Sequence, residues 1–194
     1  MTKPTPGSYT AVVADAFGVI LEADAVTRAV RRIAAEVIER VDARHRLAVV
    51  GIRRGGVALS ERIAAEVGTL EGRAVPTGTV DIALYRDDAA MSLPSPKIGP
   101  TSISFDVEGR DVLLVDDVLQ TGRTVRAAID CLLDYGRPRR IWYACLVDRG
   151  GRELPVAPDF CGKRLEADSA MRLSLRQGEL DRLELIATPR GGVG

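Results

Sequence analysis

The stretch from Val112 to Thr124, VLLVDDVLQTGRT, decides how the chain is expected to fold. It begins with apolar residues, continues with the adjacent acids Asp116 and Asp117, and ends in a Thr-Gly-Arg-Thr turn that opens a helical pattern. A glycine and a proline, Gly136 and Pro138, supply the stop signal of that helix. A buried strand, a polar turn and a helix in this order are typical of one unit of a parallel sheet.

An earlier segment repeats the same order. Leu47 to Ile52 is an apolar run, Arg53-Arg54-Gly55-Gly56 is a turn, and Val57 to Val67 has helical spacing. Ile141 to Val147 is a further apolar run. Strands that are apolar throughout and alternate with helices indicate a parallel sheet covered on both faces. We therefore expect an α/β, Rossmann-like fold in which two glycine-containing loops meet at one edge of the sheet.

Two other regions belong to the expected domain. Apolar residues recur at helical spacing from Ala25 to Val41, and Asp24 stands where a helix cap is expected. Met171 to Arg176 and Arg182 to Ile186 alternate in polarity, which indicates a C-terminal antiparallel hairpin.

The region before the acidic motif is less regular. Val75 to Tyr85 has a strand-like pattern, but Arg86 to Pro100 has no periodicity and carries proline, serine and glycine. A loop of that length in a compact domain is usually functional or disordered, and we interpret it as a mobile lid within a hood of about residues 80–108. Residues 1–14 are expected to form a flexible tail and residues 15–190 a single domain.

Composition limits the classes of partner. The 194 residues include 27 basic and 27 acidic side chains, so no net field attracts nucleic acid or an anionic membrane, and any polyanion site must be local. There is no signal peptide pattern and no apolar run long enough to span a bilayer, so we expect a cytoplasmic protein without a membrane partner. Cys131, Cys145 and Cys161 are widely spaced and His45 is alone, which argues for ordinary thiols and against a structural metal site.

The acidic motif has the chemistry of a sugar phosphate site. Free N–H groups at a helix start favour a phosphate, and the Thr121 and Thr124 hydroxyls can add hydrogen bonds to it. Gly122 allows close approach of the backbone. The carboxylates of Asp116 and Asp117 can accept hydrogen bonds from two ribose hydroxyls. The alternative is a solvated strand end followed by an ordinary helix cap.

The motif and four other segments together resemble a known family. VLLVDDVLQTGRT resembles the phosphoribosyl pyrophosphate (PRPP) signature of type I phosphoribosyltransferases. Residues 81–88 (DIALYRDD), 136–138 (GRP), 146–150 (LVDRG) and 152–155 (RELP) resemble the pyr operon regulator/uracil phosphoribosyltransferase (PyrR) family. The resemblance extends from about Ala16 to Lys163.

This resemblance implies a type I phosphoribosyltransferase fold with a flexible hood, and Mg²⁺-dependent transfer of ribose 5-phosphate from PRPP to uracil, giving UMP and pyrophosphate. It implies that Mg²⁺ is held mainly by PRPP, with no assigned protein ligand. Pyrophosphate would contact Arg53, Arg54 and Gly55, and Arg86 on the hood. The implied PRPP loop consists of Asp116, Asp117, Val118, Leu119, Gln120, Thr121, Gly122, Arg123 and Thr124, and the catalytic set is Asp116, Asp117 and Arg86.

The resemblance also implies that Asp148 and Arg149 contribute to the base and nucleotide pocket, although a strand-end salt bridge is the alternative. The family usually has arginine where Gly55 stands, which brings this loop closer to the form found in purine enzymes. A purine acceptor therefore remains an alternative to uracil. Arg139 is expected to be a surface residue without a part in the site.

Members of the family also bind pyrimidine-operon leader RNA. Arg28, Arg31 and Arg32 share one face of the first expected helix, and Arg152 and Lys163 match basic positions of the family's RNA-facing region. The family's usual histidine is replaced by Gly151, so a solvated arginine face is the alternative. Two further hypotheses are a nucleotide-sensing RNA-binding regulator with little catalysis and a PRPP sensor acting on a partner. The resemblance implies a homo-oligomer, a dimer or higher.

Overall fold

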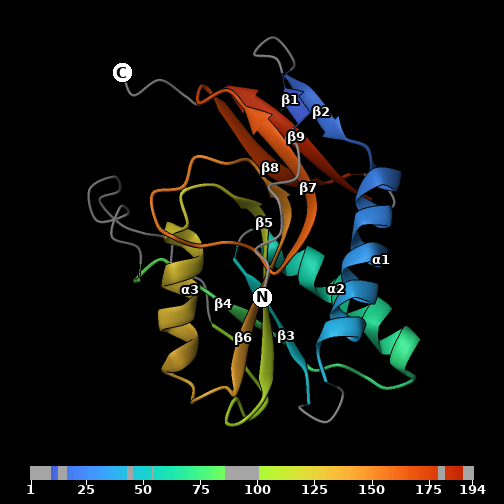
Figure 1. The fold of residues 1–194 in the computed structure, drawn as a ribbon, viewed down its shortest axis with the longest axis vertical. Helices are drawn as coiled ribbons and strands as arrows, with labels where there is room; N and C mark the ends of the chain where they lie inside the picture. Colours follow the sequence, from blue (N-terminus) through green and yellow to red (C-terminus); the bar gives the residue numbers. More distant parts are fainter. Residues whose placement is uncertain are drawn as a thin grey trace, which may run out of the picture.

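The computed structural model describes residues 10–12, 17–42, 46–53, 55–85, 101–178 and 182–189. Its main element is a six-stranded sheet in the order β1-β7-β6-β5-β3-β4, in which every neighbouring pair is parallel (Figure 1). The strands are β1 (Thr10–Val12), β3 (Ala48–Ile52), β4 (Thr77–Val80), β5 (Asp111–Leu119), β6 (Arg140–Asp148) and β7 (Phe160–Ala167).

Helices cover both faces of this sheet, as the apolar strands predict (Figure 1). The helices α1 (Ala23–Arg40) and α2 (Gly56–Glu71) pack into one core cluster, and α3 (Arg123–Leu133) packs into the other. The central strands are buried on both sides, with Val112 to Val115 and Ala144 to Val147 fully enclosed. The expected Rossmann-like α/β fold is confirmed, and parallel strands fix their loops at a common edge.

A second sheet of three antiparallel strands lies beyond the main one, in the order β2-β9-β8. Its strands β8 (Met171–Gln177) and β9 (Leu183–Pro189) form the expected hairpin, so that prediction is confirmed. The third strand, β2 (Gly18–Leu21), was not predicted, because four residues give too short a pattern. This sheet buries Met171, Leu183 and Leu185 in the core cluster that contains α1.

Several sequence predictions differ in detail from the structure. Glu22, rather than Asp24, stands at the N-cap of α1 without a side-chain cap bond, and the Asp24 carboxylate pairs with Arg182 at 2.7 Å. The strand expected from Val75 to Tyr85 is limited to Thr77–Val80, and turns follow it. Strand β1 places residues 10–12 in the sheet, whereas we expected a flexible tail through residue 14.

Arg139 is exposed, as expected, and its guanidinium also pairs with a buried acid. Its Nε donates to Asp111 Oδ1 at 2.7 Å and its Nη2 to Asp111 Oδ2 at 2.5 Å. The Asp111 side chain is fully buried and also accepts the Trp142 Nε1–H at 3.2 Å. The hydrogen bonds from Asp111 raise the pKa of the Arg139 guanidinium. Arg139 therefore satisfies a buried carboxylate at the start of β5.

The hood is only partly described. Residues 86–100, with Arg86, lie outside the described part of the chain. On the near side, the Tyr85 hydroxyl donates to the Asp134 carboxylate, and this bond raises the tyrosine pKa to about 12. On the far side, Ser102 forms an antiparallel bridge with Thr79 of β4. Within the described residues, no helix is long and apolar enough to cross a membrane.

Candidate functional site

The two predicted glycine loops meet at the carboxyl ends of β3 and β5. An ideal Cβ atom built on Gly56 would lie 2.1 Å from the Val115 carbonyl oxygen, and one built on Gly55 would lie 2.2 Å from the Asp117 Cγ atom. A Cβ atom on Gly56 would require the backbone of β5 to move, whereas one on Gly55 would require the flexible Asp117 side chain to turn away. The start of α2 therefore presses directly against the acidic end of β5, and glycine is required at position 56.

The two acids occupy different environments. Asp116 is 5% exposed, and its Oδ1 atom accepts the Asp117 N–H at 3.0 Å. Asp117 is half-buried, with Oδ1 accepting the Val118 N–H at 2.9 Å and Oδ2 accepting the Leu175 N–H at 3.0 Å. The Leu175 bond joins the C-terminal hairpin to the acidic motif. No sequence signal marks this contact, since the donor is a backbone group.

The Thr-Gly-Arg-Thr turn opens α3 as expected. Gly122 has φ of 93°, a left-handed conformation that favours glycine, and Arg123 begins the helix. The Thr121 hydroxyl accepts the Arg123 N–H at 3.3 Å, and the Arg126 N–H donates to the Gly122 carbonyl at 3.1 Å. The turn and the positive end of the helix dipole thus lie directly after the two acids.

The segment that follows β6 packs over this turn. The N–H groups of Glu153 and Leu154 donate to the Thr121 carbonyl at 3.0 and 2.9 Å, and the Glu153 carboxylate pairs with Arg123 at 2.7 Å. The Leu154 Cβ atom lies 3.2 Å from where a Cβ of Gly122 would stand. Sequence analysis missed Glu153 and Leu154, although they fall inside the RELP segment that contributed to the resemblance.

Asp148 and Arg149 lie beside the turn, but their side chains face inward. Asp148 is 2% exposed and its Oδ1 atom both accepts the Gly150 N–H at 3.0 Å and pairs with Arg152 at 2.6 Å. The buried Arg149 guanidinium donates to the carbonyls of Met171 at 2.8 Å, Asp168 at 2.7 Å and Ala167 at 3.2 Å. These contacts favour the strand-end salt bridge for Asp148 and a structural role for Arg149.

The predicted pyrophosphate residues are partly visible. Arg53 is described, and its backbone N–H donates to the Val80 carbonyl at 3.0 Å. Its Nε atom is buried and has no hydrogen-bond partner within the described residues. Arg54 lies outside the described residues, as does Arg86. An arginine donor without a partner at the end of β3 is suited to an anion.

A buried tyrosine stands one strand from the acids. The Tyr143 hydroxyl on β6 has no hydrogen-bond partner within the described part of the chain. Burial raises the pKa of Tyr143 well above its usual range, and the charge of Asp116 acts in the same direction. The Tyr143 hydroxyl is therefore uncharged and can donate a hydrogen bond.

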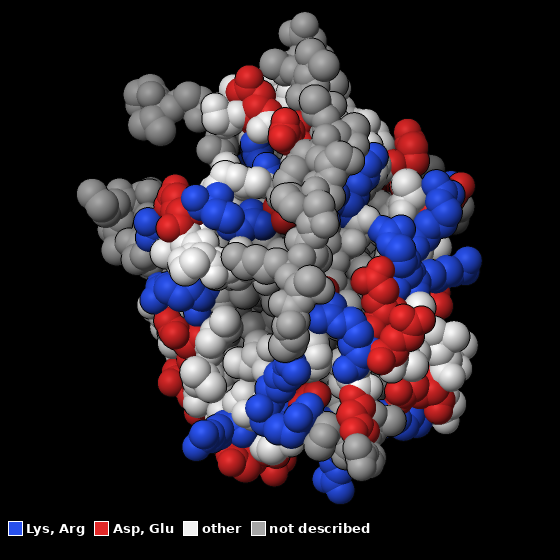
Figure 2. Space-filling view, in the orientation of Figure 1, with Lys and Arg blue, Asp and Glu red and all other residues white. Residues whose placement is uncertain are grey.

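The predicted RNA-facing residues do not form a uniform patch. Arg31 contacts Glu66 at 3.4 Å, Arg32 donates to the Gly162 carbonyl and lies 3.9 Å from Glu36, and Lys163 and Arg28 are exposed. Arg152 points inward, since it donates to the Gln120 and Val156 carbonyls at 2.8 and 2.9 Å. Figure 2 shows blue and red side chains interspersed on the visible face.

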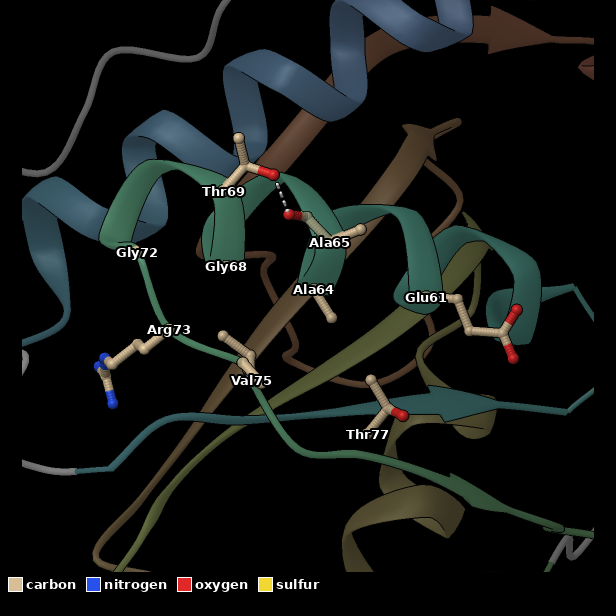
Figure 3. Close-up of a pocket in the computed structure, with 10 residues that line it drawn as sticks. Glu61, Ala64, Ala65, Gly68, Thr69, Gly72, Arg73, Val75 and Thr77 are labelled. Atoms are coloured by element: carbon tan, nitrogen blue, oxygen red, sulfur yellow. Dashed lines mark hydrogen bonds between the residues drawn. The ribbon is translucent and has the colours of Figure 1, made fainter.

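Two cavities in the described part of the chain lie away from the two loops. The larger one, of about 580 Å³, is lined by the second half of α2 and by the segment leading into β4, including Glu61, Arg73 and Thr77 (Figure 3). This cavity is open to solvent. It is far from the acids, because the start of α2, at the other end of the helix, is the part that contacts β5. A second cavity, of about 380 Å³, lies between α1 and β7 and includes Cys161 and Lys163.

The acids could take part in metal binding only together with a substrate. Within the described ranges, no group of three or more His, Cys, Asp and Glu residues could hold an ion alone. Asp116 and Asp117 supply adjacent carboxylates, and Mg²⁺ prefers to complete its shell with substrate phosphate oxygens and water. The donor set therefore fits an ion that arrives with a phosphorylated ligand.

Comparison with known proteins identifies relatives of the whole domain. Residues 18–170 match the phosphoribosyl transferase domain family. The chain is 51% identical to the bifunctional protein PyrR of Roseiflexus sp. (strain RS-1) over 84% of this chain and 88% of the relative. It is 49% identical to the bifunctional protein PyrR of Deinococcus deserti over 86% of this chain and 91% of that relative.

Solved structures with the same fold are more distant. The hypoxanthine phosphoribosyltransferase of Trypanosoma cruzi has a TM-score of 0.64 at 13% identity, covering 89% of this chain and 97% of that one. A hypoxanthine-guanine phosphoribosyltransferase of Bacillus anthracis has a TM-score of 0.63 at 11% identity, covering 87% and 97%. At these identities the likeness shows the fold alone.

Proposed function

This chain belongs to the PyrR family and carries its phosphoribosyl transferase domain, and from that premise we propose that it transfers ribose 5-phosphate from PRPP to uracil, giving UMP and pyrophosphate. The observation that carries the proposal is the placement of Asp116 and Asp117 directly before a helix-opening turn. One loop can therefore bind both ends of a ribose 5-phosphate. The Gly55–Gly56 turn lies against it, where the leaving pyrophosphate would be bound.

We propose that the 5-phosphate binds at the start of α3. The first N–H groups of a helix lack intrahelical partners, and the dipole favours an anion there. Thr121 and Thr124 add hydroxyl donors, while Gly122 supplies the left-handed backbone that the turn needs. The Arg123 side chain pairs with Glu153 and so helps to hold the turn in place.

The acids would receive the ribose hydroxyls. A carboxylate offers about four acceptor positions. Asp117 uses one on each oxygen for the N–H groups of Val118 and Leu175, so acceptor capacity remains on both atoms. These backbone bonds also hold the carboxylate in one orientation. A fixed acceptor pair lowers the cost of ordering the sugar in the reactive geometry.

The chemical demand is to stabilise separating charges. As pyrophosphate leaves the anomeric carbon, positive charge develops on the ribose and negative charge on the leaving group. The buried Arg53 Nε–H can donate a hydrogen bond to that leaving group. On the ribose side, the negative charges of Asp116 and Asp117 can stabilise the developing positive charge. We propose Mg²⁺ as the cofactor; bound through the pyrophosphate oxygens, it would neutralise the leaving group. Arg54 and Arg86 remain predicted pyrophosphate contacts.

The acceptor base would lie beside the end of β6. The strand end that carries Asp148 and Arg149 pairs with the PRPP loop, since Leu119 is the register partner of Asp148. Because both side chains face inward, we propose that they support the wall of the base pocket from behind. Direct contacts to uracil would then come from backbone groups of this turn. A purine acceptor is the alternative, motivated by Gly55 in place of arginine.

We further propose that the protein binds pyrimidine-operon leader RNA, through Arg28, Arg31, Arg32 and Lys163. Arg152 is better assigned to the protein interior, because its guanidinium contacts Asp148 and the carbonyls of Gln120, Gly150 and Val156. The family relationship also supports a cytoplasmic homo-oligomer, a dimer or higher. A regulator with little catalysis would keep the RNA contacts without turnover.

A single assay distinguishes the enzyme from a PRPP sensor without turnover. Purified protein is incubated with PRPP and uracil, with and without Mg²⁺, and UMP and pyrophosphate are quantified. We expect equal amounts of both products, and only with the metal. Absence of UMP despite calorimetric binding of PRPP would replace the enzyme by the sensor. Absence of PRPP binding as well would remove the proposed site.

A further inference from the structure

Cys145 and Cys161 are separated by 15 residues in the sequence but are direct neighbours in the main sheet. Cys145 on β6 and Cys161 on β7 are register partners across two parallel strands. Register partners in a parallel pair project from the same face, so the two thiols stand side by side. They share a side-chain hydrogen bond.

The spacing of the backbones suits a covalent bridge. Neighbouring strands lie about 4.8 Å apart. Disulfides join Cα atoms that are roughly 4.4 to 6.8 Å apart. The strands therefore need little separation or sliding to form the bond. The third thiol, Cys131 on α3, is buried and has contacts with Thr101 and the Asp81 carbonyl instead.

The two thiols differ in access. Cys145 is fully buried, whereas Cys161 is partly exposed and lines the cavity of about 380 Å³ next to α1. A small oxidant can reach Cys161 because this residue is partly exposed. Cys145 can then be reached only from Cys161 and not from solvent.

The two thiols also differ in acidity. The hydrogen bond from Cys145 lowers the pKa of Cys161, and the charge of Arg164 acts in the same direction against burial and Asp148. Burial raises the pKa of Cys145 well above its usual range. A partly exposed thiol of lowered pKa beside a buried thiol is the arrangement found in oxidation-sensitive pairs.

We propose that Cys145 and Cys161 form an oxidisable site that a peroxide converts into an intramolecular disulfide. The Cys161 sulfur attacks one peroxide oxygen, so that a sulfenic acid and one water form. The Cys145 sulfur then attacks the Cys161 sulfur, the S–O bond breaks, and the Cys145 proton leaves with the hydroxide as a second water. Overall two thiols lose two electrons and the peroxide is reduced to two waters.

The site lies close to the proposed substrate loop. Cys145 is the register partner of Asp116, so Asp116, Cys145 and Cys161 form one row across β5, β6 and β7. The proposal does not depend on the activity of that loop, because it concerns only the chemistry of the thiols.

The test is mass spectrometry of the full chain after titration with hydrogen peroxide. Free thiols are alkylated under denaturing conditions, and peptides are mapped without reduction. Starting from three alkylated cysteines, we expect a fall to one, on Cys131, with a peptide that links Cys145 to Cys161. Dithiothreitol should restore all three. A link through Cys131, a link between two copies, or three free thiols after peroxide treatment would overturn the proposal.

Two variants extend the test. Cys145→Ser should stop the reaction at the Cys161 sulfenic acid, which a cyclic diketone probe captures, whereas Cys131→Ser should leave the linked peptide unchanged. Equal capture of sulfenic acid at Cys161 with and without Cys145 would contradict the second step. If Cys145→Ser does not fold, the map of the unsubstituted protein still decides the question.

Discussion

The Asp117 carboxylate fills the space beside Gly55 in which any other residue would place its Cβ atom. That atom would lie 2.2 Å from the carboxylate carbon, well inside van der Waals contact. Asp117 is also held by the Leu175 N–H, so displacing it would break a contact with the C-terminal hairpin. One glycine and one acid thus set the distance between the two substrate loops.

Gly56→Ala should lower turnover of PRPP and uracil by roughly tenfold to a hundredfold. Its Cβ atom would lie 2.1 Å from the Val115 carbonyl oxygen and displace the backbone that carries the two acids, and a displacement of about 1 Å at a reacting group is enough for such a loss. Steady-state kinetics should show the KM for PRPP rising. The control is Gly178→Ala in the β8–β9 turn, where an added Cβ would meet its nearest atom at an ordinary 3.5 Å. Similar kinetics for both variants would contradict the packing argument.

Asp117→Asn should keep the fold and lose activity. The amide oxygen can still accept the Leu175 N–H, but the negative charge that faces the ribose is removed. We expect a loss of about a hundredfold in kcat/KM for PRPP. Asp130→Asn, at an exposed acid on α3 that pairs with Arg126, is the matched control. Comparable losses at both acids would remove Asp117 from the site.

Arg139→Ala should affect stability without affecting the chemistry. Among the described residues, its loss leaves the Trp142 N–H as the remaining side-chain partner of the buried Asp111 carboxylate, which is a costly state for a charge. We expect the midpoint of thermal unfolding to fall by roughly 5 °C or more. The kcat at low temperature should stay unchanged. Arg137→Ala, at an exposed neighbour, is the control, and an equal effect there would contradict this role.

Arg152 should behave as an interior residue. Arg152→Ala removes the contacts to Asp148 and to the Gln120 and Val156 carbonyls, so the free energy of unfolding should fall by about 2 kcal/mol. Chemical denaturation measures this fall. Lys163→Ala, at an exposed position, should leave stability unchanged. Loss of RNA affinity in Arg152→Ala without any loss of stability would restore the family-based expectation.

The affinity for leader RNA should depend on the charges of a few exposed basic side chains. If Arg28 and Lys163 contact phosphates, each alanine variant should reduce the salt dependence of leader RNA binding by about one unit of slope in a plot of log K against log salt. UMP should strengthen the binding of the unsubstituted protein. Arg137→Ala is the control. If RNA binding does not respond to UMP, or if the slopes do not change, the proposed RNA contacts are wrong and these basic side chains form an ordinary solvated surface.

The fold could be predicted largely from the sequence, because strands buried on both faces leave continuous apolar runs such as Val112 to Val115. The helix start at Gly122 and the C-terminal hairpin also carry local signals. Strand β2 does not, since four residues cannot define a period. The surface position of Arg139 was predicted, but its pairing with the buried Asp111 was not, because the sequence carries no local signal of that contact.

The candidate site can be proposed from the sequence, but the contacts that hold its residues in place cannot. Asp116, Asp117 and the following turn are contiguous, so their chemistry is visible in one segment. The Leu175 N–H, the Leu154 side chain and the Cys145–Cys161 pair reach their places through tertiary folding, and spacing alone does not indicate them. Asp148 and Arg149 lie at the predicted edge, but the direction of their side chains required coordinates.

The most direct measurement is the rate of nucleotide formation from PRPP with each free base in turn, under identical Mg²⁺ and protein concentrations. Uracil, hypoxanthine, guanine, xanthine and orotate are compared by kcat/KM, with products identified by chromatography. We predict UMP as the main product, with the other bases turned over far more slowly. Turnover of a purine base alone would contradict the uracil assignment while leaving the PRPP loop in place.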